Sequence, residues 1–136
     1  MCGIDMQLSI AESFIAWAKV KIRIHASERV IYFREGEMWW ASLGANIGYE
    51  QNGKHENFER PVLILRKFSR HVLWVIPLST KLKDHTYYYH NDYDGKMYSA
   101  ILIQLRLISC KRLVRRIGFF PGVHLRAIRQ RIKEMI

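Results

Sequence analysis

The chain has 136 residues, which suits one compact domain with a real core. Its 49% hydrophobic and 12% aromatic residues exclude a disordered polypeptide, and its longest apolar runs fall far short of the roughly 20 residues that cross a bilayer. The formal net charge is +10, of which +8 lies between Ile101 and the end, so we expect a polyanionic partner (nucleic acid, an acidic protein or anionic lipid) rather than a merely solvated face.

The first predicted element is an amphipathic helix over residues 7–22. Its apolar residues recur at spacings of 3 and 4 and form one stripe: Leu8, Ala11, Ile15, Ala18 and Ile22. The end of the helix stays open, because residues 20–25 also alternate as a strand does. A narrow, neutral stripe favours docking on protein, the body of the chain or a second copy, over lying on a membrane. We assign residues 1–34 to an N-terminal helical extension and residues 35–136 to the main domain.

From Arg29 onward the pattern predicts short strands rich in Val, Ile, Tyr and Trp, separated by Gly, Asn and Asp. The predicted strands are Val30–Phe33, Glu37–Leu43, Pro61–Arg66, Val72–Leu78, Thr86–His90 and Met97–Ile103. Two helices are expected after them, at Cys110–Arg116 and Pro121–Met135. The fold class is therefore mainly β with added helices, in the form of a small barrel or a strongly coiled sheet.

The two cysteines, Cys2 and Cys110, show no CxxC spacing and no pairing pattern. The N-terminal apolar stretch is broken by Asp5, Glu12 and Lys19, so it does not read as a secretory signal. We expect reduced thiols and a cytoplasmic protein.

A polar loop, Ala45–Glu59, is long for a compact domain, and such loops are usually functional or mobile. It carries Glu50 just after Gly48 and ends at Arg60, which Pro61 forces into an extended start of the next strand. An arginine fixed at a strand start can hold a phosphate through its fork of donors. The alternative is a structural ion pair between Arg60 and Glu59.

A strand end with two hydroxyls and a lysine follows, at Ser79, Thr80 and Lys81. Such hydroxyls either contact a ligand or cap a turn. None of the six histidines has ligand-like neighbours, and His85 and His90 are expected on opposite faces of one strand, so we predict no metal site.

Six segments of the chain form an ordered set over about residues 35–135. They are Gly36-Glu37-Met38-Trp39, Gly48-Tyr49-Glu50-Gln51-Asn52-Gly53, Arg60-Pro61-Val62, Pro77-Leu78-Ser79, Gln104-Leu105-Arg106 and Arg112-Leu113. In this order they resemble the PemK/MazF family of toxins from type II toxin–antitoxin systems. That family has threonine where Ser79 stands, and residues 54–59 are additional here.

The resemblance implies an SH3-like barrel of the MazF/PemK/CcdB type, a homodimer, a cognate acidic antitoxin, and cleavage of single-stranded RNA without metal or cofactor through attack by the ribose 2′-hydroxyl. It implies catalytic roles for Arg60, Ser79 and Glu50. The residues expected to bind RNA are Gln51, Thr80, Lys81, Gln104 and Arg106. The alternative function is that of a toxin on the same barrel that binds a protein target such as DNA gyrase without catalysis.

Overall fold

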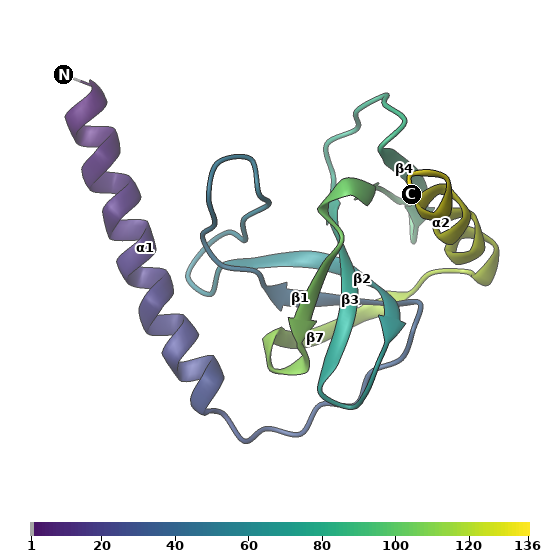
Figure 1. Ribbon diagram of the computed structural model, residues 1–136, viewed down its shortest axis with the longest axis horizontal. Helices are drawn as coiled ribbons and strands as arrows, with labels where there is room; N and C mark the ends of the chain where they lie inside the picture. Colours follow the sequence, from purple (N-terminus) through teal and green to yellow (C-terminus); the bar gives the residue numbers. More distant parts are fainter. Residues whose placement is uncertain (1) are drawn as a thin grey trace.

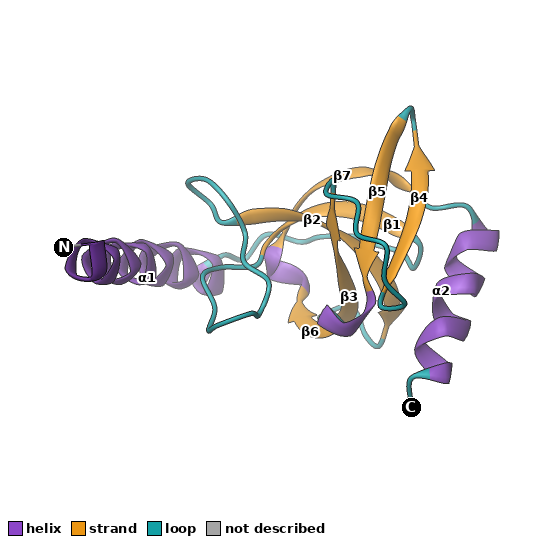
Figure 2. Cartoon of the chain, turned by 90° about the horizontal axis from the view of Figure 1, so that it is seen from above, coloured by secondary structure: helices purple, strands orange, loops and turns teal. Residues whose placement is uncertain are grey.

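The computed structural model describes residues 2–136, with side chains from Ser9 onward. A long helix, α1 (Cys2–Ala26), precedes a β-rich body, and a short helix, α2 (Gly122–Glu134), follows it (Figures 1 and 2). The strands are β1 (Glu37–Ser42), β2 (Glu59–Lys67), β3 (Val72–Ser79), β4 (Tyr88–Tyr93), β5 (Lys96–Ile101), β6 (Arg106–Ser109) and β7 (Leu113–Phe119). Two single-turn 3₁₀ helices, η1 (Leu102–Gln104) and η2 (Cys110–Arg112), flank β6. The prediction of a mainly β chain with a helix at each end is confirmed.

All seven strands join one antiparallel sheet in the order β4-β5-β3-β2-β1-β7, and β6 pairs with β3. One edge of β3 pairs with β2 over Leu73–Pro77, and along the other edge β3 changes partner, from β6 at Val72–Val75 to β5 at Leu78 and Ser79. This change of partners coils the sheet strongly (Figure 2). Neither helix, over the residues described, combines the length and apolarity that a membrane span requires.

The central strands are buried on both faces, which explains the unbroken apolar run of β2. On one face Val62 and Ile64 of β2 pack with residues of β1, β3, β6 and β7. On the other face Leu63 and Leu65 pack with β5 and with α2, which contributes Leu125 and Ile128. The single thiol whose side chain is described, Cys110, is free and buried.

The helix α1 docks by a face other than the predicted one. Trp17 and Val20 are buried against Phe58, with Ile24 beside them. Of the predicted stripe, Ala11, Ile15, Ala18 and Ile22 are all exposed, and the side chain of Leu8 lies outside the described residues. The docked face has the same spacing of 3 and 4 as the predicted stripe but is shorter, and it carries the large aromatic ring that packs against the body.

Three further predictions need correction. Residues 30–33 form no strand but belong to an irregular linker, which side chains tie to the end of β2: Lys67 Nζ donates to the Phe33 carbonyl at 3.2 Å, and the carboxylate of Glu35 accepts the N–H of Lys67 at 2.8 Å. Residues 110–116 form η2 and most of β7 rather than a helix, since β1 offers a free edge that β7 pairs with. The strand β6 was not expected.

The hairpin β4–β5 is shifted along the chain from its predicted place. β4 runs to Tyr93, through residues expected to form a turn, and the turn itself is confined to Asp94 and Gly95. Both have positive φ, 50° and 78°, which is the backbone that a two-residue hairpin requires.

Candidate functional site

Arg60 stands at the start of β2 with its guanidinium half-buried between two backbone carbonyls. Its Nε donates to the carbonyl oxygen of Asn52 at 2.7 Å, and its Nη1 donates to that of Leu78 at 3.2 Å. Burial lowers the pKa of Arg60, but a guanidinium stays charged at physiological pH. The alternative pair with Glu59 does not form, because Glu59 instead binds Arg115 at 2.8 Å. Arg60 therefore holds a positive charge with no carboxylate bound to it in the described part of the chain.

Ser79 ends β3 directly after Leu78, whose carbonyl accepts a hydrogen bond from Arg60. The β2–β3 register ends at the pair of Val62 with Pro77, two residues before Ser79 on β3 and two after Arg60 on β2. The Ser79 Oγ accepts the backbone N–H of Lys81 at 3.1 Å, which is the turn-capping contact left open by the sequence. Its hydroxyl hydrogen remains available to a ligand, and the side chains of Thr80 and Lys81 are exposed.

The loop that carries Glu50 is held by side chains rather than by regular structure. Asn46 Nδ2 donates to the carbonyls of Gln51 (2.8 Å) and Leu43 (3.2 Å). From outside the loop, Gln104 uses both ends of its amide: Nε2 donates to the Tyr49 carbonyl at 2.9 Å, and Oε1 accepts the Gln51 N–H at 3.1 Å. The Gln104 side chain, predicted to bind RNA, thus positions the loop in this structure.

An open groove of about 570 Å³ lies between this loop and the segment after β5. Its walls include Glu50, Gln51, Gln104 and Arg106, four of the eight predicted site residues. Glu50 is exposed there, and its Oε1 accepts the N–H of Ile47 at 2.9 Å. The other four residues lie outside the groove at the ends of β2 and β3. Asn52 links the two groups, because it follows Gln51 in the loop and accepts the bond from Arg60.

There are two more half-buried arginines near the loop: Arg106 lines the groove, and Arg112 lines a second cavity of about 450 Å³ beside α1. Nη1 of Arg106 donates to the Leu43 carbonyl at 3.5 Å, and Nη1 of Arg112 donates to the carbonyls of Ser42 (3.2 Å) and Leu43 (3.3 Å). Burial lowers the pKa of both, partly offset in Arg106 by the charge of Glu50 and reinforced in Arg112 by the charge of Arg106. The ion pairs in the described residues use other arginines, namely Arg115, Arg116 and Arg129.

Arg112 was not among the predicted site residues, although its Arg-Leu motif and the basic C-terminal quarter pointed toward it. The guanidinium groups of Arg60, Arg106 and Arg112 all donate to backbone carbonyls rather than to carboxylates. Their positive charges and their remaining N–H donors are therefore free to bind an anion. A polar surface of this kind, with no paired carboxylates, fits a phosphate-bearing ligand.

α1 supports this arginine cluster from behind. The guanidinium of Arg112 lies 5.6 Å from the centre of the Trp17 ring. The centres of the Trp17 and Phe58 rings are 5.5 Å apart. A Cβ at Gly44 would come within 2.3 Å of Trp17, so the helix and the start of the loop fit only with glycine at that position. α1 therefore fixes the backbone on which Arg106 and Arg112 rest.

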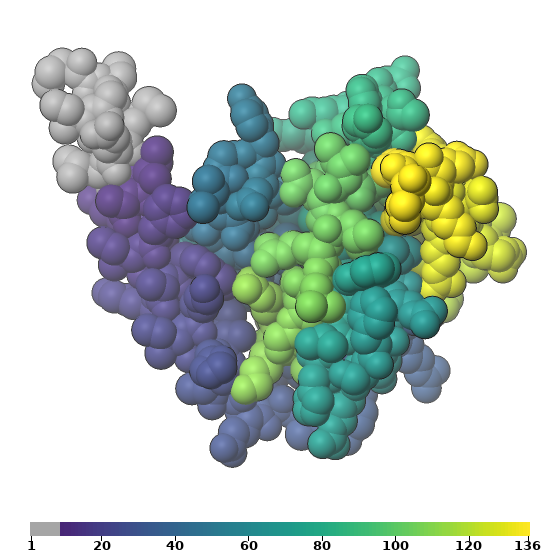
Figure 3. Space-filling model, viewed as in Figure 1, coloured from purple at the N-terminus to yellow at the C-terminus, as the bar shows by residue number. Residues whose placement is uncertain are grey.

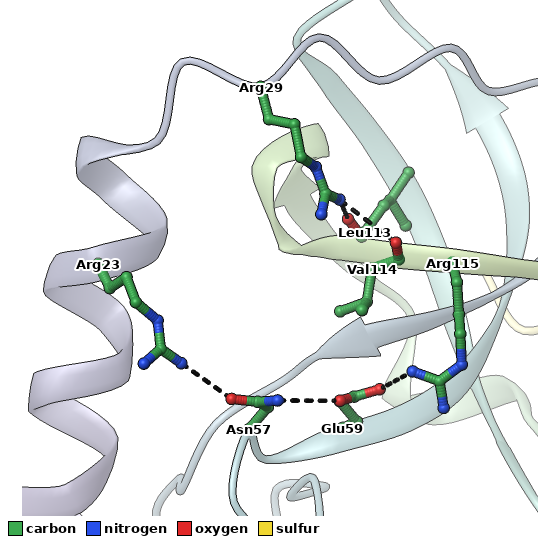
Figure 4. A network of polar contacts seen from close by, with 7 residues as sticks. All are labelled: Arg23, Arg29, Asn57, Glu59, Leu113, Val114 and Arg115. Atoms are coloured by element: carbon green, nitrogen blue, oxygen red, sulfur yellow. Dashed lines mark hydrogen bonds and ion pairs between the residues drawn. The ribbon is translucent and has the colours of Figure 1, made fainter.

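A chain of polar contacts crosses from α1 to β7 at the other end of the same loop (Figure 4). Arg23 donates to Asn57 at 2.9 Å, Asn57 donates to Glu59 at 3.4 Å, and Glu59 binds Arg115. Beyond the helix, Arg29 donates to the carbonyls of Leu113 and Val114 and fixes the linker to β7. Both ends of the loop are thus tied to the helix.

The histidines do not gather. His85 precedes β4 and accepts the N–H of Tyr87, while His90 lies on β4 and contacts Ser99 at 3.0 Å. Within the described residues, no group of three or more His, Cys, Asp or Glu comes together.

Comparison with known protein families gives a match that covers most of the chain. The family model described as "PemK-like, MazF-like toxin of type II toxin-antitoxin system" matches residues 34–136. No curated protein matches the chain.

Several solved structures share the fold. MazF from Deinococcus radiodurans aligns with a TM-score of 0.61 at 15% identity, over 77% of this chain and 97% of that one. The Mycobacterium tuberculosis toxin MazF-mt6 aligns at 0.56 and 18% identity, over 72% and 93%. A mycobacterial endoribonuclease in complex with its cognate antitoxin aligns at 0.59 and 12% identity, over 76% and 93%. These identities are low, so the likeness shows the fold alone.

Proposed function

Because its residues 34–136 match the family model, the chain belongs to the PemK-like, MazF-like toxins of type II toxin–antitoxin systems, and on that premise we propose that it is a metal-independent endoribonuclease that cleaves single-stranded RNA. The observation that carries the proposal is the set of three half-buried arginines, Arg60, Arg106 and Arg112, each held by backbone carbonyls. They leave a concentrated positive charge next to an open groove, which suits a phosphodiester backbone.

In the proposed reaction, the ribose 2′-oxygen attacks the adjacent phosphorus and the bond from phosphorus to the 5′-oxygen breaks. The products are a 2′,3′-cyclic phosphate and a free 5′-hydroxyl. Glu50 takes the proton of the 2′-hydroxyl, because it is the exposed carboxylate in the groove. The leaving 5′-oxygen takes a proton from water.

Arg60 stabilises the negative charge that develops on the phosphorane, since a fixed donor acts most strongly where charge appears in the transition state. Ser79 donates its free hydroxyl hydrogen to a phosphate oxygen. An RNA strand laid from the groove to the end of β3 passes Glu50 first and then Arg60, with the backbone of Asn52 between them. Arg106 and Arg112 hold the neighbouring phosphates.

The positive charge of the arginine cluster also favours an acidic protein partner. The structures similar to this chain include complexes of MazE with MazF and of an endoribonuclease with its antitoxin. We infer that a cognate antitoxin with an acidic segment covers the arginine cluster and blocks RNA, and that the net charge of +10 speeds their encounter.

The test is incubation of the purified chain with a defined single-stranded RNA in excess EDTA, followed by mapping of the ends. We expect cleavage in chelator, with a cyclic phosphate on one fragment and a 5′-hydroxyl on the other. A shift of the RNA without cutting overturns the proposal in favour of a binding toxin. Activity that is lost in chelator and restored by Mg²⁺ overturns the mechanism.

A further inference from the structure

The helix α1 lies outside the part of the chain that the family model matches, and it presents an apolar face to solvent. In both views α1 lies at the periphery, with the rest of the molecule on one side of it (Figures 1 and 2). The space-filling view shows the same helix along one edge, with an open outer side (Figure 3).

The residues of this apolar face form a regular stripe, which we name the α1 seam: Ala11, Ile15, Ala18 and Ile22. The two isoleucines are 59% and 70% exposed. At about 100° per residue, the seam points roughly 160° away from the docked face formed by Trp17, Val20 and Ile24. The body of the same chain therefore leaves most of the seam uncovered and approaches it only at Ile22, which lines a cavity together with Lys111 and Arg112.

The order of large and small residues within the α1 seam is self-complementary in one direction. If two copies of α1 pair antiparallel about an axis between residues 16 and 17, Ile15 faces Ala18 of the second copy and Ile22 faces Ala11. Each large side chain then meets a small one, as interlocking helices require. In a parallel pair isoleucine would meet isoleucine and alanine would meet alanine, so the layers would alternate between crowded and empty.

The flanking charges select the same direction. Glu12 and Lys19 lie on one flank of the seam, and antiparallel helices bring like flanks together. Glu12 of each copy then faces Lys19 of the other, which gives two ion pairs across the interface. A parallel pair would set Glu12 and Lys19 against the opposite flank, which carries Phe14 and Lys21.

Each body is docked on the opposite face of its own helix and comes near the seam only at the cavity beside Ile22. We propose that the α1 seam is a self-association surface, through which two copies of this chain pair their α1 helices antiparallel around a two-fold axis. The surface is distinct from any association of residues 34–136 and does not depend on the proposed ribonuclease activity.

The first experiment measures self-association of the full chain by sedimentation equilibrium. We expect the wild type to show an association step that the double variant Ile15→Lys/Ile22→Lys lacks, beyond any association of residues 34–136 that the two proteins share. Its affinity should fall by about 100-fold or more because four lysines enter an apolar interface. Both isoleucines are exposed in the single chain, so helical circular dichroism should not change, and neither should thermal stability at concentrations too low for the seam to associate. Ile10→Lys is the matched control: Ile10 is 51% exposed on the same helix but lies off the seam, and its variant should associate as the wild type does.

The second experiment tests the direction of pairing by charge exchange. Glu12→Lys should weaken association several-fold, and Glu12→Lys/Lys19→Glu should restore it, which a parallel pair cannot do. The proposal is overturned by a wild type that is monomeric at every concentration, by a seam variant that associates unchanged, or by failure of the charge exchange. It is equally overturned if the seam is needed only for binding to anionic vesicles, or only for binding to the antitoxin.

Discussion

The guanidinium of Arg60 binds the carbonyl oxygen of Leu78 at 3.2 Å, so the start of β2 is fastened to the end of β3 directly before Ser79. This contact leaves the remaining donors of the guanidinium for a ligand, and it sets the distance between the two predicted catalytic side chains. The strongest prediction concerns this arginine.

Replacing Arg60 by alanine should lower the rate of RNA cleavage by about 10²–10³, the usual cost of losing one donor to a developing oxyanion. The free energy of unfolding should also fall, by about 1–3 kcal/mol, because the two hydrogen bonds from the guanidinium to backbone carbonyls are lost, so cleavage is compared at a temperature where both proteins are folded. Arg60→Lys should be intermediate, since lysine keeps the charge but lacks the planar fork of donors that binds a phosphate and the two carbonyls at once. Arg66→Ala, an exposed arginine on the same strand, serves as the control and should cleave normally. Near-normal cleavage by Arg60→Ala in single-turnover assays would contradict the assignment.

Gln104→Ala should free the loop that carries Glu50, because both hydrogen bonds to Tyr49 and Gln51 are lost. We expect faster amide hydrogen exchange at Gln51 and slower cleavage, with a loss of unfolding free energy of about 1–2 kcal/mol for two partly exposed bonds. Gln104→Glu keeps the acceptor for the Gln51 N–H and removes only the donor, so its exchange at Gln51 should stay near that of the wild type. Equal exchange in all three proteins would show that Gln104 does not hold the loop.

Gly44→Ala should destabilise the chain far more than Gly48→Ala. Both glycines have positive φ, 92° and 58°, where a side chain costs about 1–2 kcal/mol. Only at Gly44 would the new Cβ also meet the Trp17 ring, whereas Gly48 faces open space. Urea denaturation measures the difference. If Trp17→Ala relieves part of the Gly44→Ala penalty in the double variant, the clash is its cause; similar losses at both glycines would argue against tight docking of α1.

Glu37 should make the protein sensitive to acid. Its burial raises the pKa of the carboxyl, but hydrogen bonds from Arg116, the Arg34 N–H and Trp39 outweigh burial and hold the pKa below its ordinary value. A depressed pKa in the folded state stabilises the fold above the pKa of the unfolded chain, and this stability is lost as the pH falls through the folded value. Unfolding free energy should therefore drop below about pH 4.5, near the unfolded pKa of glutamate.

The matched variant for that prediction is Glu37→Gln, which keeps an acceptor oxygen but cannot titrate. It should be less stable than the wild type at neutral pH, by about 1–3 kcal/mol for a hydrogen bond to a charged partner. Its stability should also fall less steeply in acid. Parallel slopes for the two proteins in a series of urea titrations would remove Glu37 as the source of the acid sensitivity.

Much of the β architecture follows from local pattern. The runs that became β1, β2, β3 and β5 carry the Val, Ile and Trp content that strands favour, and glycines and asparagines mark the turns between them. The wrong predictions concern segments whose structure is decided by tertiary contacts rather than by local sequence. The pattern at residues 110–116 fits a helix as well as a strand, and the free edge of β1 decides in favour of β7. The docked face of α1 was missed because two apolar stripes share the spacing of 3 and 4, and the longer one is not the one that the body covers.

The candidate site was predictable to the level of residue types and no further. The ordered motifs pointed to Glu50, Gln51, Gln104 and Arg106, and the groove does bring these four together. Their contacts follow from the folded chain alone: Gln104 is occupied by the loop backbone, and Arg112 joins the arginine cluster by resting on the carbonyls of β1. The stacking of Trp17 on Arg112 had no signal in the sequence, because the two residues are 95 positions apart.

The seating of Trp17 over Gly44 and Phe58 bears on how this toxin should be produced and truncated. A protein cut to the part that the family model matches would lose the indole and leave Phe58 and Ala45 bare on its surface. Newly exposed apolar surface favours aggregation and binding by chaperones. Poor yield or inactivity of such a fragment would therefore reflect the loss of the α1 helix that covers these residues, rather than a defective nuclease.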